Sequence, residues 1–231
     1  MKQAAQEQVE DKAPPPQDLT TLGDLTLTTE TINGLANISE PMFSLVIWER
    51  KTPQSLQKWF AEQQPEQLPS GRVLADRHNI REAIKTFFLK NKHNEQNEQQ
   101  WLANDIVQLA QKYADITGSN KIDIRLDVIQ NDACWKFHLD RVDYRLVTTY
   151  KGEGTQYVSP ENAEQAINEQ TDYSGPIKKI DEQNVAIFKG SNNTCGKGIV
   201  HRSPPIKEKQ ETRLLLCLNA RSEVSPNLWS S

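Results

Sequence analysis

The spacing of apolar residues changes at Lys121, and no other feature of the sequence constrains the fold as strongly. In the stretches 79–90 and 98–113, apolar residues recur every three to four positions, which is typical of helices packed along one face. From Lys121 to Val128, charged and apolar residues alternate, which predicts a strand with one buried face. Helices followed by strands indicate an α+β fold.

Short strands dominate the second half of the chain. Further strands are predicted at 134–139, 144–150, 155–158, 185–189, 199–201 and 212–219. Glycine-containing turns at 152–154 and 190–198 separate several of them, since glycine supplies the backbone conformations that tight turns need. We therefore predict a cupin-like double-stranded β-helix, or jelly roll, with an N-terminal helical layer.

Two helix starts and one early strand can also be placed. The apolar run 41–48 predicts a buried strand, and Thr52 and Pro53 predict the cap and first turn of a helix. A second short helix is predicted at 160–168, with Ser159 as its cap. Hydroxyl side chains at these positions can accept hydrogen bonds from the free N–H groups of a first turn.

The 231 residues suffice for one medium domain. Residues 1–20 are rich in Gln and Glu, contain three consecutive prolines and are expected to form a disordered lead-in. Residues 21–219 are expected to form a single domain, with 21–118 as a mainly helical layer and 119–219 as the β-helix core. The polar residues 220–231 are expected to form a loose tail.

Composition excludes several classes of partner. Lys and Arg total 27 against 31 Asp and Glu, a formal net charge of −4, which argues against a broad nucleic-acid-binding surface. No apolar run reaches the roughly 18 residues of a membrane span, and the N-terminal residues lack the apolar segment of a Sec signal peptide. Three cysteines fit a reducing compartment better than a disulfide framework. We expect a cytoplasmic protein with no nucleic-acid or membrane partner.

Two histidines and an aspartate are the candidate metal ligands. His138 and Asp140 lie two positions apart in a predicted strand, so their side chains point to the same face about 6.6 Å apart along the chain. His201 precedes a turn further on. Two imidazoles and one carboxylate are the facial triad of non-haem Fe(II) oxygenases, which leaves positions open for a bidentate 2-oxo acid and dioxygen.

Three further residues are candidates for binding a co-substrate. Arg213 lies on an apolar strand, where a buried guanidinium needs an anion, and the distal carboxylate of a co-substrate would supply one bidentately. Arg145 is a candidate for a second anion contact. Tyr150 is a candidate to point into the barrel and hydrogen-bond the co-substrate.

Residues 137–158, 177–190 and 201–219 resemble the core of 2-oxoglutarate/Fe(II)-dependent dioxygenases of the prolyl-hydroxylase-like branch. The shared order is His-x-Asp, an Arg-containing strand, a Gly-rich turn before a Thr, a distal His and a basic residue on the last strand. Most of the chain more closely resembles a bacterial uncharacterised family, domain of unknown function 1826, with its His-x-Asp, Gly-x-Gly-Thr and His-Arg-Ser-Pro-Pro motifs. That resemblance implies a link to metal homeostasis, because members tend to be encoded beside zinc-responsive metallochaperone GTPases.

The favoured hypothesis is an Fe(II)/2-oxoglutarate-type dioxygenase that hydroxylates an unknown substrate. A second hypothesis is a non-redox protein that buffers or delivers zinc with the same His/Asp/His site, and a third is a degenerate β-helix that serves only as a binding module. A rival zinc site would join Cys134 and His138 to Cys195 and His201. In a strand, Cys134 and His138 would lie about 13 Å apart, too far to share one ion. Cys195 could still approach the metal from its loop, whereas Cys134 and Cys217 are expected to be small buried residues.

Overall fold

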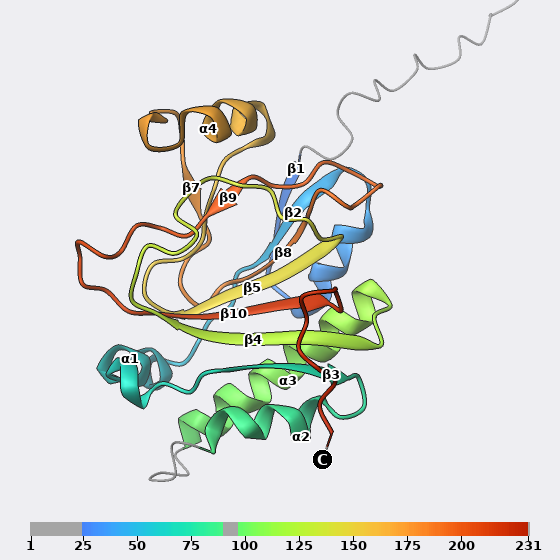
Figure 1. Cartoon of the computed structure of the whole chain (residues 1–231), viewed down its shortest axis with the longest axis vertical. Coiled ribbons are helices and arrows are strands. Elements are labelled where there is room, and N and C mark those ends of the chain that lie inside the picture. The colour runs from blue at the N-terminus through green and yellow to red at the C-terminus, as the bar shows by residue number, and fades with distance from the viewer. Residues whose placement is uncertain (1–24, 90–96, 231) are drawn as a thin grey trace, which may run out of the picture.

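The computed structural model describes residues 25–89 and 97–230. Its two sheets face each other, and helices cover the outer face of the larger one (Figure 1). The predicted disordered lead-in, 1–20, lies outside the described residues. No helix in the described part of the chain is long and apolar enough to cross a membrane.

The main sheet has seven strands in the order β1-β2-β8-β5-β10-β4-β3. Only β1 and β2 run parallel, and the other neighbours are antiparallel. The strands are β1 (Leu25–Thr29), β2 (Phe43–Trp48), β3 (Gly71–Asp76), β4 (Lys121–Ile129), β5 (Tyr144–Lys151), β8 (Val185–Lys189) and β10 (Arg213–Ala220). The alternating residues that predict β4 therefore form a strand one position in from the sheet edge.

The minor sheet has three short strands in the order β7-β6-β9, namely β6 (Gln156–Tyr157), β7 (Lys178–Lys179) and β9 (His201–Arg202). It packs on the main sheet through an apolar layer to which Leu45, Val147 and Leu215 contribute from one side and Tyr157 and Ile199 from the other. Two facing sheets of mostly antiparallel strands behind helices are the predicted α+β fold with a double-stranded β-helix, and this prediction is confirmed.

Helices α2 (Ile80–Lys85) and α3 (Asn97–Thr117) pack on the other face of the main sheet (Figure 1). Leu102, Ile106 and Leu109 of α3 contact the same apolar core as Leu214 and Leu216 of β10. The remaining helices are α1 (Gln54–Glu62), α4 (Ala163–Glu169) and the 3-10 helices η2 (Ile32–Ser39), η3 (Pro65–Gln67), η4 (Thr86–Phe88), η5 (Pro160–Asn162) and η6 (Gln170–Asp172). Because side chains alternate along β10, residues 214, 216 and 218 face the helices, whereas 213, 215 and 217 face the barrel interior.

Several local predictions differ from the structure. The segment 21–118 supplies β1, β2 and β3 to the main sheet as well as helices. The predicted strand at 134–139 contributes only an isolated bridge at His138, because Cys134 has a φ of 60° and turns the chain. Neither Thr52 nor Ser159 caps a helix through its side chain. The predicted loose tail contacts the sheet, since Trp229 N–H donates to Leu74 O at 2.8 Å.

Candidate metal centre

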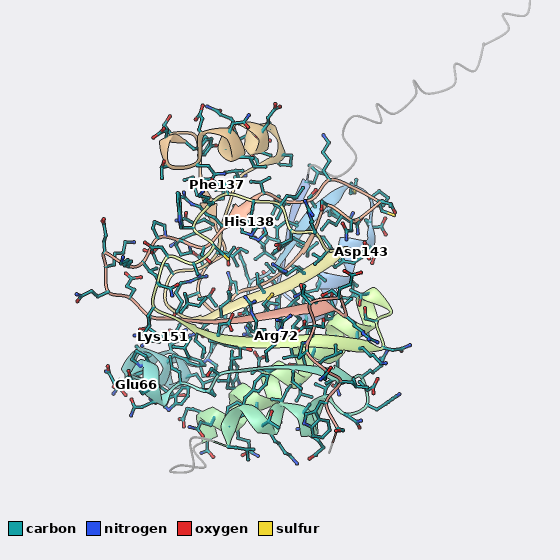
Figure 2. All side chains as sticks on the ribbon, in the orientation of Figure 1. Glu66, Arg72, Phe137, His138, Asp143 and Lys151 are labelled. Carbon is teal, nitrogen blue, oxygen red and sulfur yellow. The ribbon has the colours of Figure 1, made fainter. Side chains whose placement is uncertain are left out.

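The two candidate histidines face each other across a backbone bridge. His138 N–H donates to His201 O, and His201 N–H donates to His138 O, each at 3.0 Å. The ring centroids lie 4.6 Å apart. Figure 2 shows His138 on the side of the main sheet away from α2 and α3. The bridge fixes the two imidazoles side by side at the mouth between the sheets.

Asp140 completes the cluster from the loop after His138. One ligand atom from each of His138, Asp140 and His201 lies within 4.8 Å of the others. Asp140 Oδ1 lies 3.6 Å from His138 Nε2, and Asp140 Oδ2 lies 3.2 Å from His201 Nε2. The structure therefore brings together the three residues that the sequence proposes as ligands.

Backbone carbonyls fix the orientation of both rings. His138 Nδ1 lies 2.8 Å from Lys136 O, and His201 Nδ1 lies 3.1 Å from Ile199 O. A carbonyl can only accept, so Nδ1 carries the proton in each neutral ring and the Nε2 lone pair faces Asp140. Metal-binding imidazoles usually donate their second ring N–H to a carbonyl or carboxylate in this way, which fixes the orientation of the ring.

Asp140 is held ionised. Burial alone would raise its pKa, but His138 and His201, which donate to Asp140 from Nε2 when the rings are protonated, and the charge of Arg145 lower the pKa of Asp140 well below its usual range. The hydrogen bond between His138 and Asp140 raises the pKa of His138, and burial of the ring partly offsets this rise. Asp140 Oδ2 is buried and has no hydrogen bond of good geometry within the described structure, although Arg145 Nη1 lies at 2.6 Å.

A divalent cation fits this donor set. With both rings neutral, two Nε2 lone pairs and a carboxylate point at one another, and only Arg145 brings positive charge to the carboxylate from among the described side chains. Three acceptors in one place repel one another unless a proton or a cation lies between them. Two imidazoles and one carboxylate on one side of an ion match the ligand set of non-haem iron.

A cavity of about 270 Å³ opens beside the cluster. His138 and His201 line one part of it, and Arg125 from β4 and Leu215 from β10 line another. The cavity lies between the main sheet and the minor sheet, where such barrels hold small ligands. It gives a small molecule access to the metal ligands.

Arg213 is fully buried and has no carboxylate partner among the described residues. Its Nε–H donates to Glu153 O at 2.6 Å, and its terminal nitrogens donate to the hydroxyls of Ser203 and Thr149. Burial lowers the pKa of Arg213 to about 10. The charge of Glu153 offsets part of this lowering of the pKa, but no carboxylate forms an ion pair with the buried guanidinium among the described residues.

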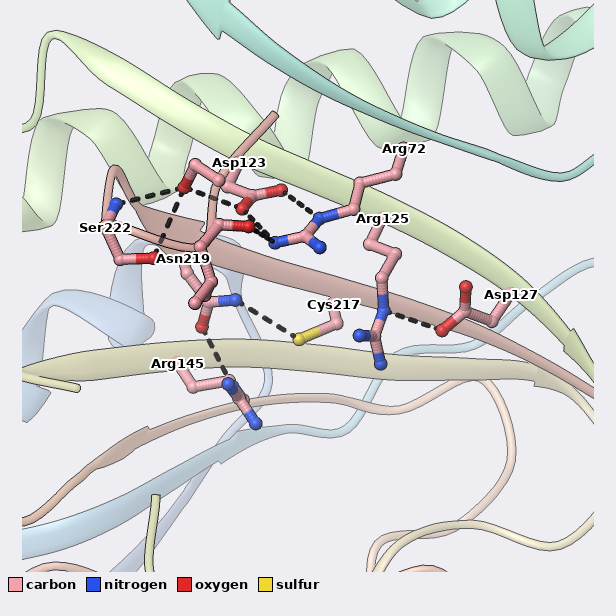
Figure 3. Close-up of polar contacts among 10 residues, drawn as sticks. Arg72, Asp123, Arg125, Asp127, Arg145, Cys217, Asn219 and Ser222 are labelled. Carbon is pink, nitrogen blue, oxygen red and sulfur yellow. Dashed lines mark hydrogen bonds and ion pairs between the residues drawn. The ribbon is translucent and has the colours of Figure 1, made fainter. Parts of the chain in front are cut away.

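Arg145 reaches the cluster, but Tyr150 does not. Arg145 Nε–H donates to Asn219 Oδ1 at 2.8 Å (Figure 3). Its Nη1 pairs with Asp140. Tyr150 lies on the opposite face of β5, in the core shared with the helices, and donates to Asp105 Oδ2 at 2.7 Å. The predicted role of Tyr150 as a co-substrate contact inside the barrel is therefore wrong. Side chains alternate between the two faces of a strand. Counting along β5 from Arg145, on the interior face, would therefore have placed Tyr150 outside the barrel.

The rival cysteine site is not assembled. The converging group of possible ligands in the described chain contains no cysteine. Cys195 lies exposed in its loop, and its carbonyl accepts from Lys189 Nζ. Cys217 is buried as predicted, but Cys134 is exposed because of its turn conformation.

Supporting residues around the site were missed by the sequence analysis. Thr149 and Ser203 bind Arg213, and Asn219 binds Arg145. Thr149 lies on the interior face of β5 with Arg145 and Val147, so a period of two could have identified it. Ser203 precedes two prolines and has no local pattern that marks it, and only the tertiary fold brings it to Arg213.

Comparisons with known proteins were made for the whole chain. A family model described as "Protein of unknown function (DUF1826)" matches residues 29–219. No curated protein matches significantly. A dioxygenase for auxin oxidation from Arabidopsis thaliana, solved as a 2-oxoglutarate complex, is 12% identical, with 87% of this chain and 94% of that chain covered at a TM-score of 0.46.

Two bacterial structures are similar at the same level. A bsmA homologue from Methylobium petroleophilum is 12% identical, with 90% of this chain and 100% of that chain covered at a TM-score of 0.46. A Pseudomonas putida prolyl-4-hydroxylase is 13% identical, with 83% and 99% covered at a TM-score of 0.39. At these identities, the residues of the site have to carry any conclusion about function.

Proposed function

The chain belongs to the family of proteins of unknown function DUF1826, and we propose that it is an Fe(II)/2-oxoglutarate-type dioxygenase that hydroxylates a small molecule. His138, Asp140 and His201 would hold the iron, and Arg213 would bind the distal carboxylate of 2-oxoglutarate. When bound by such a set, iron supplies the electrons that activate dioxygen.

The observation that carries this proposal is the buried guanidinium of Arg213. A protein that only buffers or delivers zinc needs the three ligands but gains nothing from an uncompensated charge inside its barrel. An oxo acid bound to the metal at one end needs a cation at the other, and a guanidinium binds a carboxylate through two parallel hydrogen bonds. Arg213 lies on the face of β10 that points into the barrel. It donates to Ser203, and Ser203 lines the same cavity as His201.

The other residues of the site would orient these groups. The carbonyls of Lys136 and Ile199 keep the Nε2 atoms of both histidines free to bind the ion. Arg145 would hold one oxygen of Asp140, which leaves the other oxygen for the ion. Thr149 and Ser203 would hold the guanidinium of Arg213 in place for its carboxylate partner.

Anaerobic calorimetry of 2-oxoglutarate with the Mn(II)-loaded protein tests the proposal. The wild type should bind, and Arg213→Gln should lose about 2–4 kcal/mol of binding free energy, the scale for a desolvated charge-assisted pair. Metal affinity should stay nearly unchanged in this variant, because a guanidinium does not ligate a cation. Arg213→Lys keeps the positive charge but loses the paired donors of the guanidinium. Its affinity for 2-oxoglutarate should therefore lie between those of the wild type and Arg213→Gln.

Arg81→Gln is a matched control, because Arg81 is an exposed arginine that contacts Asn104 away from the cavity. It should bind 2-oxoglutarate as the wild type does. If the Mn(II)-loaded wild type fails to bind 2-oxoglutarate at millimolar concentration, the oxygenase proposal is wrong, and zinc binding by the same three residues takes its place.

A further inference from the structure

The cavity beside the metal ligands extends beyond the space that a small oxo acid needs. From His138 and His201 it continues over β5 and β10 to the interior face of β4, where Arg125 and Asp127 line it. Arg125, Cys217 and Val147 lie opposite one another on three adjacent strands. This end of the cavity, which we call the Arg125 end, lies on a different strand from the candidate metal ligands and Arg213.

The charges that line the cavity are mostly positive. Arg125, Arg145 and Arg202 contribute three guanidinium groups, and Asp127 is the one carboxylate that lines it within the described structure. Arg145 is committed to Asp140 and Asn219. Arg202 donates to Gln156 through Nε, and its guanidinium lies over the ring of Phe137 at 4.2 Å from the ring centroid. On the main-sheet side of the cavity, Arg125 is the guanidinium with donors left for a ligand.

The geometry of Arg125 leaves one edge of its guanidinium open. Asp127 Oδ2 binds only Nε, at 2.7 Å. The two terminal nitrogens of Arg125 make no hydrogen bond or ion pair with the residues that the structure describes, and Figure 3 shows them on the side of Cys217, turned away from Asp127. The edge formed by two guanidinium nitrogens matches the two oxygens of a carboxylate or a phosphate.

Apolar side chains lie between the Arg125 end and the metal ligands. Val147 and Leu215 line the cavity, and Cys217 lies between Val147 and Arg125 on the middle of three adjacent strands. Burial raises the pKa of Cys217, so this thiol is neutral and adds no charge. A ligand that reaches both ends of the cavity thus has an anionic group at one end and an apolar part over the sheet.

We propose that the primary substrate is a small organic acid whose carboxylate or phosphate group binds Arg125, with its apolar part over Val147 and Leu215. This proposal rests on the proposed function only in calling the ligand a substrate. Bound in this way, the acid would present its apolar part toward His138 and His201, which is where a hydroxylation would take place.

Calorimetry of the metal-free full-length protein with benzoate and benzamide tests the charge requirement. These probes have nearly the same size and shape, but only benzoate is anionic. The wild type should bind benzoate at millimolar concentration and benzamide at least about tenfold more weakly, as expected for a charge-assisted hydrogen-bonded pair. Arg125→Gln should lower benzoate affinity about tenfold, and Arg125→Lys should lower it less.

Two further variants locate the bound acid. Arg81→Gln and Arg213→Gln should both bind benzoate as the wild type does. If Arg213→Gln loses benzoate and Arg125→Gln retains it, the acid occupies the proposed 2-oxoglutarate subsite, and the Arg125 proposal is overturned. It is equally overturned if neither benzoate nor phenyl phosphate binds the wild type. Because no metal or 2-oxoglutarate is present, these outcomes are independent of the calorimetry that tests the oxygenase proposal.

Discussion

Asp140 is the residue on which the proposed metal centre would depend, because it is the one anion among the three proposed ligands. It is buried and lies within 3.6 Å of both imidazoles. The charge of Arg145 at 2.6 Å partly neutralises it, so the ion has to share this carboxylate with a guanidinium. Loss of the carboxylate would leave Arg145 as an unopposed positive charge beside the ion.

We therefore expect Asp140→Asn and His201→Ala to lower the affinity for Mn(II) by at least about 100-fold, since even outer contacts of metal ligands are worth 10- to 100-fold. Equilibrium dialysis with metal analysis measures this directly. His78→Ala removes an exposed histidine and should leave the affinity unchanged. Equal metal content in Asp140→Asn and the wild type would mean that the ion binds elsewhere.

The outcome at single residues shows which signals the sequence carries. The grouping of His138, Asp140 and His201 could be predicted from the order of His-x-Asp and a distal His, and the fold brings the three side chains together. Tyr150 could not be assigned from type alone, since a tyrosine fits a core equally well. Its partner Asp105 lies on α3, far away in the chain, and only the tertiary structure shows that contact.

At the scale of elements, a buried polar network joins β5, α3 and the residues that follow β2. Asp105 accepts from Tyr150 at 2.7 Å and from Arg50 Nη1 at 2.6 Å, and Arg50 Nε–H donates to Gln183 O. The side chains of Arg50 and Asp105 are each only 6% exposed. This network fixes the helical layer to the sheet on the face opposite the metal centre.

We expect Asp105→Asn to destabilise the fold by about 3–5 kcal/mol, because it leaves the charge of Arg50 buried without a counter-ion. Tyr150→Phe should cost about 1.5–3 kcal/mol, the value of one hydrogen bond to a charged group. Urea denaturation measures both. Glu82→Gln breaks an exposed pair with Lys85 and should change the free energy of unfolding by no more than about 0.5 kcal/mol. Similar losses for Asp105→Asn and Glu82→Gln would contradict a role for the network.

A second contact between elements depends on pH. Asp132 Oδ1 accepts from the backbone N–H groups of Ile206 and Lys207, which joins the loop after β4 to the loop before β10. These hydrogen bonds lower the pKa of Asp132 below the ordinary value of an aspartate, which is about 3.9. The folded state therefore binds fewer protons than the unfolded state near this pH, and stability falls as the pH decreases.

Asp132→Asn isolates this effect, because an amide oxygen can accept the same hydrogen bonds without the charge. The wild type should be more stable than Asp132→Asn at neutral pH, and the difference should shrink as the pH falls through the range in which Asp132 is protonated. Thermal denaturation at a series of pH values gives the comparison. A difference that stays constant down to pH values at which Asp132 is protonated would show that the charge contributes nothing.

The elements that could be predicted share a local pattern. β4 and β8 follow from alternation or from a short apolar run, and α3 follows from its helical spacing. β1 and β3 could not be predicted, because β1 gains its hydrogen bonds from parallel pairing with β2 and β3 gains them from pairing with β4. The predicted strand 134–139 failed for a local reason, since the backbone of Cys134 turns at a φ of 60°.

At the scale of the whole molecule, the candidate site lies between two sheets that contribute different kinds of residue to it. His201 comes from the minor sheet, His138 pairs with it by a single bridge, and Asp140 lies in the loop after that bridge. The main sheet contributes Arg145 and Arg213. An ion that joins these ligands would therefore connect the minor sheet to a loop that has few backbone contacts of its own.

Metal binding should for this reason stabilise the whole fold as well as the site. An ion that binds only the folded state adds about 2.7 kcal/mol at a free concentration of 100 times its Kd. For a chain of this size, that free energy corresponds to an increase in Tm of about 5–10 °C. We expect Mn(II) to raise the Tm of the wild type by this amount in differential scanning calorimetry, and to leave the Tm of Asp140→Asn unchanged. Arg213→Gln should respond to Mn(II) as the wild type does, because a guanidinium does not ligate a cation. An equal increase in the wild type and Asp140→Asn would place the stabilising ion outside the His138, Asp140 and His201 cluster.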